Sequence, residues 1–230
     1  MSLKICLLGQ FTLKQDGVPL ALSSRPAQSL FAYLAMTAGM AHRRERLAGL
    51  LWPDAAESNA RAYLRQALWR IRKALDSTSY SSEDYLFITD VNVTFNPDAD
   101  YWLDVDQLLA ASESAAVDRQ QEAAVLYRGE LLPGFYDEWI VPERDRLHAA
   151  YQGLMRSLIE RLLREKRWHD AAALAEQWIR LAHAPEAAFR ALMKAYAGLD
   201  DLGLVRSTFE RCREALDDDP VSYTHLTLPT

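Results

Sequence analysis

The stretch SNARAYLRQALWRIRKAL, residues 58–75, decides how the first half of the chain is interpreted. Its apolar residues recur at i, i+4, i+7 and i+11, the spacing of one helix face, as Leu64, Leu68, Ile71 and Leu75. At about 100° of turn per residue, the polar residues fall opposite this stripe and on its flanks. The opposite side carries Arg65, Gln66, Trp69 and Lys73, and the flanks carry Arg61, Arg70 and Arg72. The stretch is therefore predicted to be an amphipathic helix with a basic outer face.

The cations of residues 61–73 have no acid among them, whereas a solubilising helix face usually mixes both signs. The net charge of the whole chain is −6, but the acidity is unevenly spread. Residues 1–100 carry eleven Lys and Arg against ten Asp and Glu, and residues 101–230 carry fifteen against twenty-two. Because phosphate binding depends on local charge, the overall acidity does not exclude a nucleic-acid partner.

The segments around the basic helix alternate between short β runs and helices. We expect β runs at 3–8, 11–14 and 18–20, helices at 24–38 and 43–51, and a hairpin of 85–88 with 91–95. Asp16-Gly17 is a two-residue hairpin turn, Ser23 or Ser24 can cap the first helix, and Gly39 ends it. The order of strands, helix, short helix, basic helix and hairpin is typical of a winged helix-turn-helix.

From Trp102 onward the pattern is almost entirely helical. We expect helices at about 104–115, 118–128, 143–166, 168–182, 186–199 and 202–217. Short turns between the last four make them antiparallel neighbours. A self-similarity at about 34 residues sets Trp168 against Leu202 and Pro185 against Asp219-Pro220, as in a tetratricopeptide-type array.

The predicted fold class is therefore an α+β winged helix-turn-helix domain followed by an all-α, tetratricopeptide-like helical-repeat domain. We place the first domain at residues 1–98 and the second at 101–217. The remaining residues, 218–230, form an atypical tail that contains Thr and Pro and fits no helical period. This tail is interpreted as a truncated or read-through end.

No enzyme motif is present, since the chain has no Gly-rich phosphate loop, no H-E-x-x-H and no G-x-S-x-G. The histidines are scattered, and Cys6 and Cys212 stand alone, so no metal site is expected. The carboxylates Asp104, Asp106, Glu143 and Asp145 are interpreted as a solvated face. No apolar run reaches the roughly 20 residues of a membrane helix. We expect a cytoplasmic protein that is not an enzyme, needs no cofactor and has no membrane partner.

Two stretches of the first half resemble a known family. RRERLAGLLW, residues 43–52, is similar to the S-R-E-x-L-x-x-x-x-W second helix of OmpR/PhoB-type regulators. LRQALWRIRKAL, residues 64–75, is similar to their V-x-x-x-I-x-R-L-R-x-x-L recognition helix. Residues 1–98 thus resemble the winged-helix effector domain of that family.

Two further stretches resemble the bacterial transcriptional activator domain, which follows such winged helices in the antibiotic regulatory protein (SARP) family. RGELLPGFYDEW, residues 128–139, fits that domain's Y-x-G-x-L-L-P-G-x-x-x-x-W. ERDRL, residues 143–147, fits the E-R-x-R-L start of its next helix. The two resemblances, over residues 1–98 and 101–217, together cover nearly the whole chain, and their combination is specific.

The resemblance implies a role for each matching residue. Arg70 and Arg72 would contact base edges or phosphates in a major groove, and an outward Trp69 would contact DNA or pack against the second domain. Arg43 and Arg44 would clamp phosphates near a helix N-terminus. The implied DNA-binding set is Arg43, Arg44, Arg61, Arg65, Gln66, Trp69, Arg70, Arg72 and Lys73. The loop with Pro53, Asp54 and Glu57 matches one that touches RNA polymerase in the family.

The hypothesis is a sequence-specific activator of transcription that binds double-stranded DNA, with a homodimer on direct repeats implied by the resemblance. One departure from the family is the hairpin tip, Thr89 to Asn92, where Asp90 stands in place of a basic residue for the minor groove. Two alternatives remain open at this point. One is a signalling adaptor that binds a protein through the helical half, and the other is the N-terminal piece of a larger ATP-dependent regulator.

Overall fold

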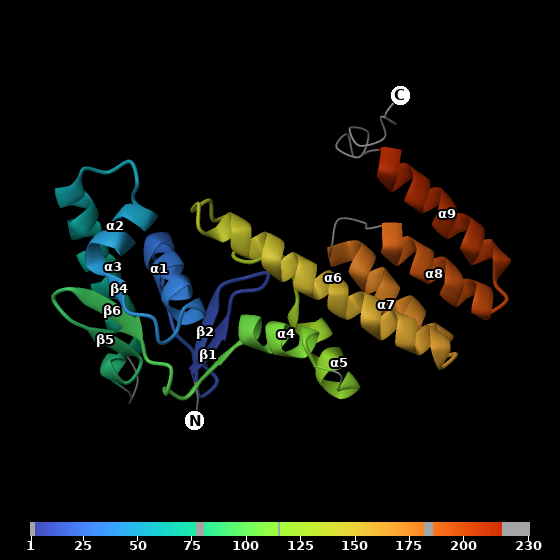
Figure 1. Ribbon diagram of the computed structural model, residues 1–230, viewed down its shortest axis with the longest axis horizontal. Helices are drawn as coiled ribbons and strands as arrows, with labels where there is room; N and C mark the ends of the chain where they lie inside the picture. Colours follow the sequence, from blue (N-terminus) through green and yellow to red (C-terminus); the bar gives the residue numbers. More distant parts are fainter. Residues whose placement is uncertain (1–2, 77–80, 115, 182–185, 218–230) are drawn as a thin grey trace. The chain divides into compact units, whose positions relative to one another are not determined.

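The computed structural model describes residues 3–76, 81–114, 116–181 and 186–217 (Figure 1). The predicted tail at 218–230 and the turn at Ala184-Pro185 lie outside these residues, and so does the predicted repeat match to Pro220. The chain divides into two compact units, which are described separately: Met1–Ala110 with Leu126–Leu147, and Ala111–Val125 with His148–Thr230. The architecture is mostly helical with a small N-terminal sheet region. The domain boundary at 98–101 stays a prediction.

The first unit opens with a four-stranded sheet in the order β3-β2-β1-β7. Its strands are β1 (Leu3–Cys6), β2 (Thr12–Gln15), β3 (Val18–Pro19) and β7 (Tyr101–Leu103). The predicted turn at Asp16-Gly17 joins β2 to β3, and both residues have positive φ, 49° and 83°. The sequence did not predict β7, which pairs in parallel with β1 so that Leu3 lies opposite Tyr101.

Asp104 corrects one expectation, because this carboxylate is not on a solvated face. It is only 2% exposed. Its two oxygens accept hydrogen bonds from the backbone N–H of Leu7, at 3.0 and 2.8 Å, and from that of Leu8, at 2.9 Å. Strand β1 ends at Cys6, so these N–H groups need an acceptor other than a strand partner. Burial raises the pKa of Asp104 to about 6, against the lowering effect of these hydrogen bonds.

Three helices and a second sheet complete the region around the basic helix. They are α1 (Arg25–Met36), α2 (Arg44–Leu51), α3 (Glu57–Leu75), the 3-10 turn η1 (Ser82–Asp84) and strands β4 (His42–Arg43), β5 (Leu86–Ile88) and β6 (Asn92–Phe95). The predicted helices and hairpin are present within a few residues of their expected bounds. Ser24 stands at the N-cap of α1, but its side chain makes no capping hydrogen bond. The sheet order β4-β6-β5 adds a short strand that the sequence did not predict.

The remaining helices follow the predicted segments closely. They are α4 (Asp104–Ser112), α5 (Val117–Leu126), α6 (Ile140–Arg164), α7 (Trp168–Leu181), α8 (Glu186–Gly198) and α9 (Leu202–Asp217). In the second unit α8 packs against both α7 and α9 (Figure 1). The ring of Trp168 lies against Gly198, where an added Cβ would come within 2.5 Å of it. None of the described helices combines the length and apolar composition that crossing a membrane requires.

Candidate nucleic-acid interface

Helix α3 separates its apolar and basic faces as the periodicity predicted. Leu64, Leu68 and Ile71 are at most 3% exposed, and α3 packs against α1 and α2. The opposite face carries four exposed side chains: Arg65, Gln66, Trp69 and Lys73. Because the apolar face fixes the rotation of the helix, the basic face is held toward solvent.

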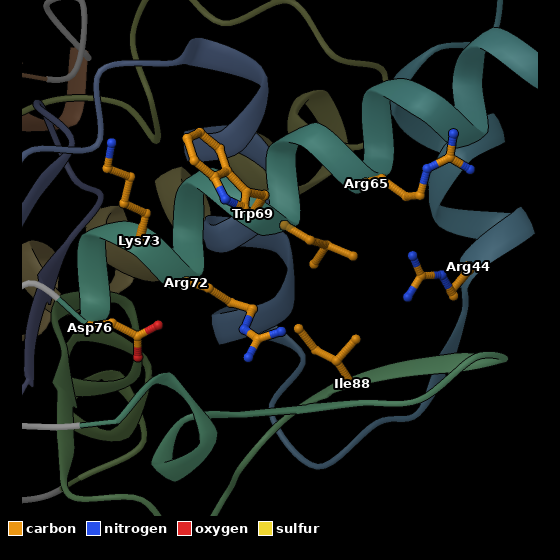
Figure 2. A pocket seen from close by; sticks show the side chains of 8 residues that line it. Arg44, Arg65, Trp69, Arg72, Lys73, Asp76 and Ile88 are labelled. Carbon is orange, nitrogen blue, oxygen red and sulfur yellow. The ribbon is translucent and has the colours of Figure 1, made fainter.

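Five of the predicted residues line one open hollow of about 770 Å³, which we call the basic hollow. They are Arg44, Arg65, Trp69, Arg72 and Lys73, together with Leu68, Asp76 and Ile88. In Figure 2 Arg72 extends from α3 toward Ile88 of the hairpin strand, Trp69 and Lys73 extend from the opposite side of the helix, and Arg44 lies on the same side of the view as Arg65. Four cations and one carboxylate therefore share a single exposed surface.

Arg44 reaches the hollow because β4 joins the hairpin. In the β4–β6 pairing Arg43 lies opposite Asn92, and the backbone N–H of Arg44 donates to the carbonyl of Val91 at 2.9 Å. The Arg44 guanidinium also donates to the carbonyl of Thr89 at 3.2 Å. Two hydrogen bonds thus connect the hairpin tip to Arg44, the first residue of α2. The same arginine lines the hollow.

Trp69 and Lys73 form a pair on the outer face of α3. The indole of Trp69 is 58% exposed, and Lys73 Nζ lies 5.1 Å from its ring centroid. An ammonium at this distance is attracted to the negative face of an indole. The pair combines a flat aromatic surface with a positive charge one helical turn away.

Two of the predicted cations have acidic neighbours, although the interval 61–73 contains no acid. Arg61 pairs with Glu57 and, at 3.4 Å, with Glu45. Arg72 lies 3.9 Å from Glu83 and donates from Nε to Ser82 Oγ at 3.4 Å. The carboxylates come from positions just outside the interval or from other elements. Arg61 is therefore partly neutralised and does not line the hollow.

The other predicted residues lie outside the basic hollow. Arg43 and Gln66 are exposed, and Arg70 is half-buried on the flank of α3. Pro53 and Asp54 are exposed in the loop that follows α2, whereas Glu57 is the first residue of α3. The predicted polymerase-contact segment is therefore split between a loop and a helix end.

Three lining residues of the hollow were not in the predicted set, and one of them, Leu68, was expected only on the apolar face of the helix. Asp76 follows Arg72 by four residues, so the helical spacing carried a signal for it. Ile88 reaches the hollow only because the hairpin folds back beside α3, and no local sequence signal indicates that approach.

The stretch at residues 128–139, which we call the strap, connects the start of α6 by hydrogen bonds to Leu7 and to α1 of the first unit. Leu132 N–H donates to the Leu7 carbonyl at 3.0 Å, and Trp139 Nε1 donates to Ser29 Oγ of α1 at 3.2 Å. Arg144 closes the strap by donating to three backbone carbonyls, those of Leu131, Leu132 and Phe135 at 2.8, 2.6 and 2.9 Å. The motif residues thus have structural partners within this unit.

The family model of the bacterial transcriptional activator domain matches residues 104–221, just over half of the 230 residues. The chain therefore belongs to this family of transcription regulators. This family relationship points to a regulator of transcription rather than to an enzyme.

A solved structure shares the fold. It is that of Mycobacterium tuberculosis EmbR in complex with a low affinity phosphopeptide, with a TM-score of 0.74 and 20% sequence identity. The match covers 95% of this chain and 60% of that chain, so this chain spans under two thirds of its neighbour's length. No curated protein sequence matches the chain.

Proposed function

We propose that this chain is a sequence-specific DNA-binding activator of transcription, in which α3 lies in the major groove of double-stranded DNA. Helices α1 to α3 and the β5–β6 hairpin would then form a winged helix-turn-helix, with α3 as its recognition helix. The observation that carries the proposal is the basic hollow, which gathers four cations on one exposed face.

We assign the cations two roles in this proposal. Arg65, Arg70 and Arg72, with Gln66, have the donor forks that recognise base edges in a major groove. Arg43, Arg44 and Lys73 would clamp the phosphate backbone. With about five to seven cations near phosphates, log affinity falls with log salt at a slope of roughly −4 to −6.

The hairpin has a supporting part in this proposal. Asp90 is exposed at its tip, and a carboxylate repels the minor groove, so the tip contributes no cation to the DNA. Arg44 donates to the tip carbonyl of Thr89, so the hairpin helps to orient a phosphate-binding arginine. Affinity then rests on α3, on the start of α2 and on pairing of two copies on direct repeats.

Activation requires a second contact, which we assign to RNA polymerase. Pro53 and Asp54 are exposed beside the proposed DNA-binding elements, which supports their role in this contact. An Asp54→Asn variant is expected to bind DNA as the wild type does and to activate less in an in vitro transcription assay.

The DNA contact is tested with sites selected from random duplexes by the full chain. The triple variant Arg65→Ala, Arg72→Ala and Lys73→Ala is expected to lose affinity on the order of a hundredfold in fluorescence anisotropy. The matched control replaces three exposed arginines of the second unit, Arg119, Arg161 and Arg213, by Ala and should bind as the wild type does. Failure to select any site, or equal affinities of the two triple variants, would overturn the proposal.

A further inference from the structure

The second unit contains a cavity of about 370 Å³ between α6, α7 and α8, which we call the helical cavity. Ile159 and Leu163 of α6 and Ala187 and Ala191 of α8 give it an apolar patch, beside four charged side chains. Its volume lies within the range of small-molecule sites, which are mostly apolar with a few placed polar groups. It belongs to a different compact unit from the basic hollow.

Trp178, one of the lining residues, has a buried hydrogen-bond donor without a partner among the described residues. Trp178 is 1% exposed, and its Nε1–H has no acceptor among the described residues. An indole can only donate, and a buried donor left unpaired destabilises the fold. A ligand in the cavity that displaced a neighbouring lining side chain could bring an acceptor to this group.

Cations from two helices line the same cavity. Arg156 of α6 and Lys194 of α8 have no ion-pair partner in the described part of the chain, and Arg190 pairs with Glu186. Glu160 is the one acid among the lining residues that the structure describes. Among the described residues, six of the nine other arginines of α6 to α9 pair with a carboxylate, whereas Arg156 and Lys194 leave two unpaired cations at one cavity.

We propose that the helical cavity binds a small organic carboxylate with an apolar body. The carboxylate takes the charge of Arg156 and Lys194, one acceptor satisfies the indole N–H of Trp178, and the body displaces water from the apolar lining. A neighbouring groove beside Trp168, of about 630 Å³, shares Glu160, Leu163 and Lys194 with the cavity. The enclosed part is large enough for one small molecule, whereas a peptide would have to extend along this groove.

The indole itself provides the test. The chain contains six tryptophans, so the ¹⁵N-labelled full-length protein gives six indole N–H signals, and the Trp178→Phe variant identifies one of them. The probe is 1-naphthoate, with benzoate and octanoate as further carboxylates and 1-naphthamide as the uncharged control. We expect 1-naphthoate to shift the Trp178 signal to saturation and 1-naphthamide to leave it in place.

Matched double variants separate the cavity from general charge effects. Arg156→Ala with Lys194→Ala should weaken 1-naphthoate binding at least tenfold. Arg119→Ala with Arg213→Ala, which removes two exposed cations outside the lining residues, should leave it unchanged. The proposal is overturned if no carboxylate moves the Trp178 signal, if the amide moves it equally, or if both double variants bind alike. A shift by an acidic peptide alone would assign the site to a protein partner and overturn the small-molecule proposal.

Discussion

The arginines of α3 and those of the later helices differ in what surrounds them. On α6 to α9 six of the ten arginines have a carboxylate partner among the described residues, as in Arg161–Glu165, Arg190–Glu186 and Arg206–Glu210. On α3, Arg65, Arg70 and Lys73 have no ion-pair partner among the described residues. A neighbouring carboxylate neutralises most of the charge of a paired arginine, whereas an unpaired arginine can attract an anionic partner. The gathering of unpaired cations on one helix supports the proposal that α3 binds DNA, which the net charge of −6 does not.

The largest effect is expected where an arginine is paired with backbone carbonyls. Arg144 is 19% exposed and donates to three carbonyls of the strap at residues 128–139. Arg144→Met leaves these acceptors without their donor and should lower the free energy of unfolding by about 2–4 kcal/mol in urea denaturation followed by circular dichroism. Arg146→Met, which removes an exposed pair with Glu143, should cost under about 0.5 kcal/mol. Equal unfolding midpoints of the two variants would contradict this distinction.

Asp104 extends the comparison to a carboxylate that has N–H donors and no cation. Its pKa is raised from 3.8 to about 6 by burial, so the folded chain holds this proton more tightly than the unfolded chain. Stability from this group is therefore greatest below about pH 4 and falls as the pH rises to about 6, by up to roughly 3 kcal/mol. In Asp104→Asn this component of the pH dependence should vanish. Unfolding curves between pH 4 and 7 with the same slope in both proteins would refute the assignment.

Helix α3 and Asp104 show what the sequence could and could not predict. The periodicity of residues 58–75 located α3 and its faces, because a single helix encodes its faces in its own spacing. The burial of Asp104 could not be predicted, since it depends on β1 meeting β7 and on N–H groups almost a hundred residues away. A carboxylate among polar neighbours carries no local sign of such a distant partner.

The candidate site also combines positions that helical spacing predicts with positions that depend on distant strand pairing. The exposed positions of Arg65, Trp69 and Lys73 follow from helical spacing, and the structure confirms them. The approach of Arg44 to α3 depends on the β4–β6 pairing. A strand of two residues has no recognisable sequence pattern, so this pairing could not be predicted. The i, i+4 spacing of Glu57 and Arg61 indicates an ion pair, but Glu57 lies just outside the acid-free interval 61–73.

Unpaired arginines of α3 should affect DNA binding and leave stability almost unchanged. Arg70→Ala is expected to cost on the order of 1–3 kcal/mol of binding free energy and to relax the preference for one site. Lys73→Ala should weaken binding by a similar factor on all sequences and lower the salt slope by about 1. Gel-shift titrations on a selected and a scrambled duplex measure both effects. A loss for Arg70→Ala that is equal on the two duplexes would remove it from sequence recognition.

Arg61 allows the comparison to be reversed within α3. Because Glu45 and Glu57 neutralise it, Arg61→Ala should lower DNA affinity less than twofold. The double variant Glu45→Gln with Glu57→Gln releases this arginine and should raise affinity about two- to fivefold, with a salt slope steeper by about 1. If the released arginine added nothing, Arg61 would lie beyond the reach of DNA. In that case the contact surface would end nearer to Arg65.

The smallest effect is expected for an exposed pair on α9. Arg206 and Glu210 lie four residues apart, with 85% and 53% of their side chains exposed, and water screens most of their attraction. Arg206→Ala should therefore change the free energy of unfolding by less than about 0.5 kcal/mol and leave DNA affinity within twofold, as measured by urea denaturation and anisotropy. A large loss of DNA affinity in this variant would mean that a paired arginine outside α3 also meets the nucleic acid. The distinction between paired and unpaired arginines would then no longer identify the binding surface.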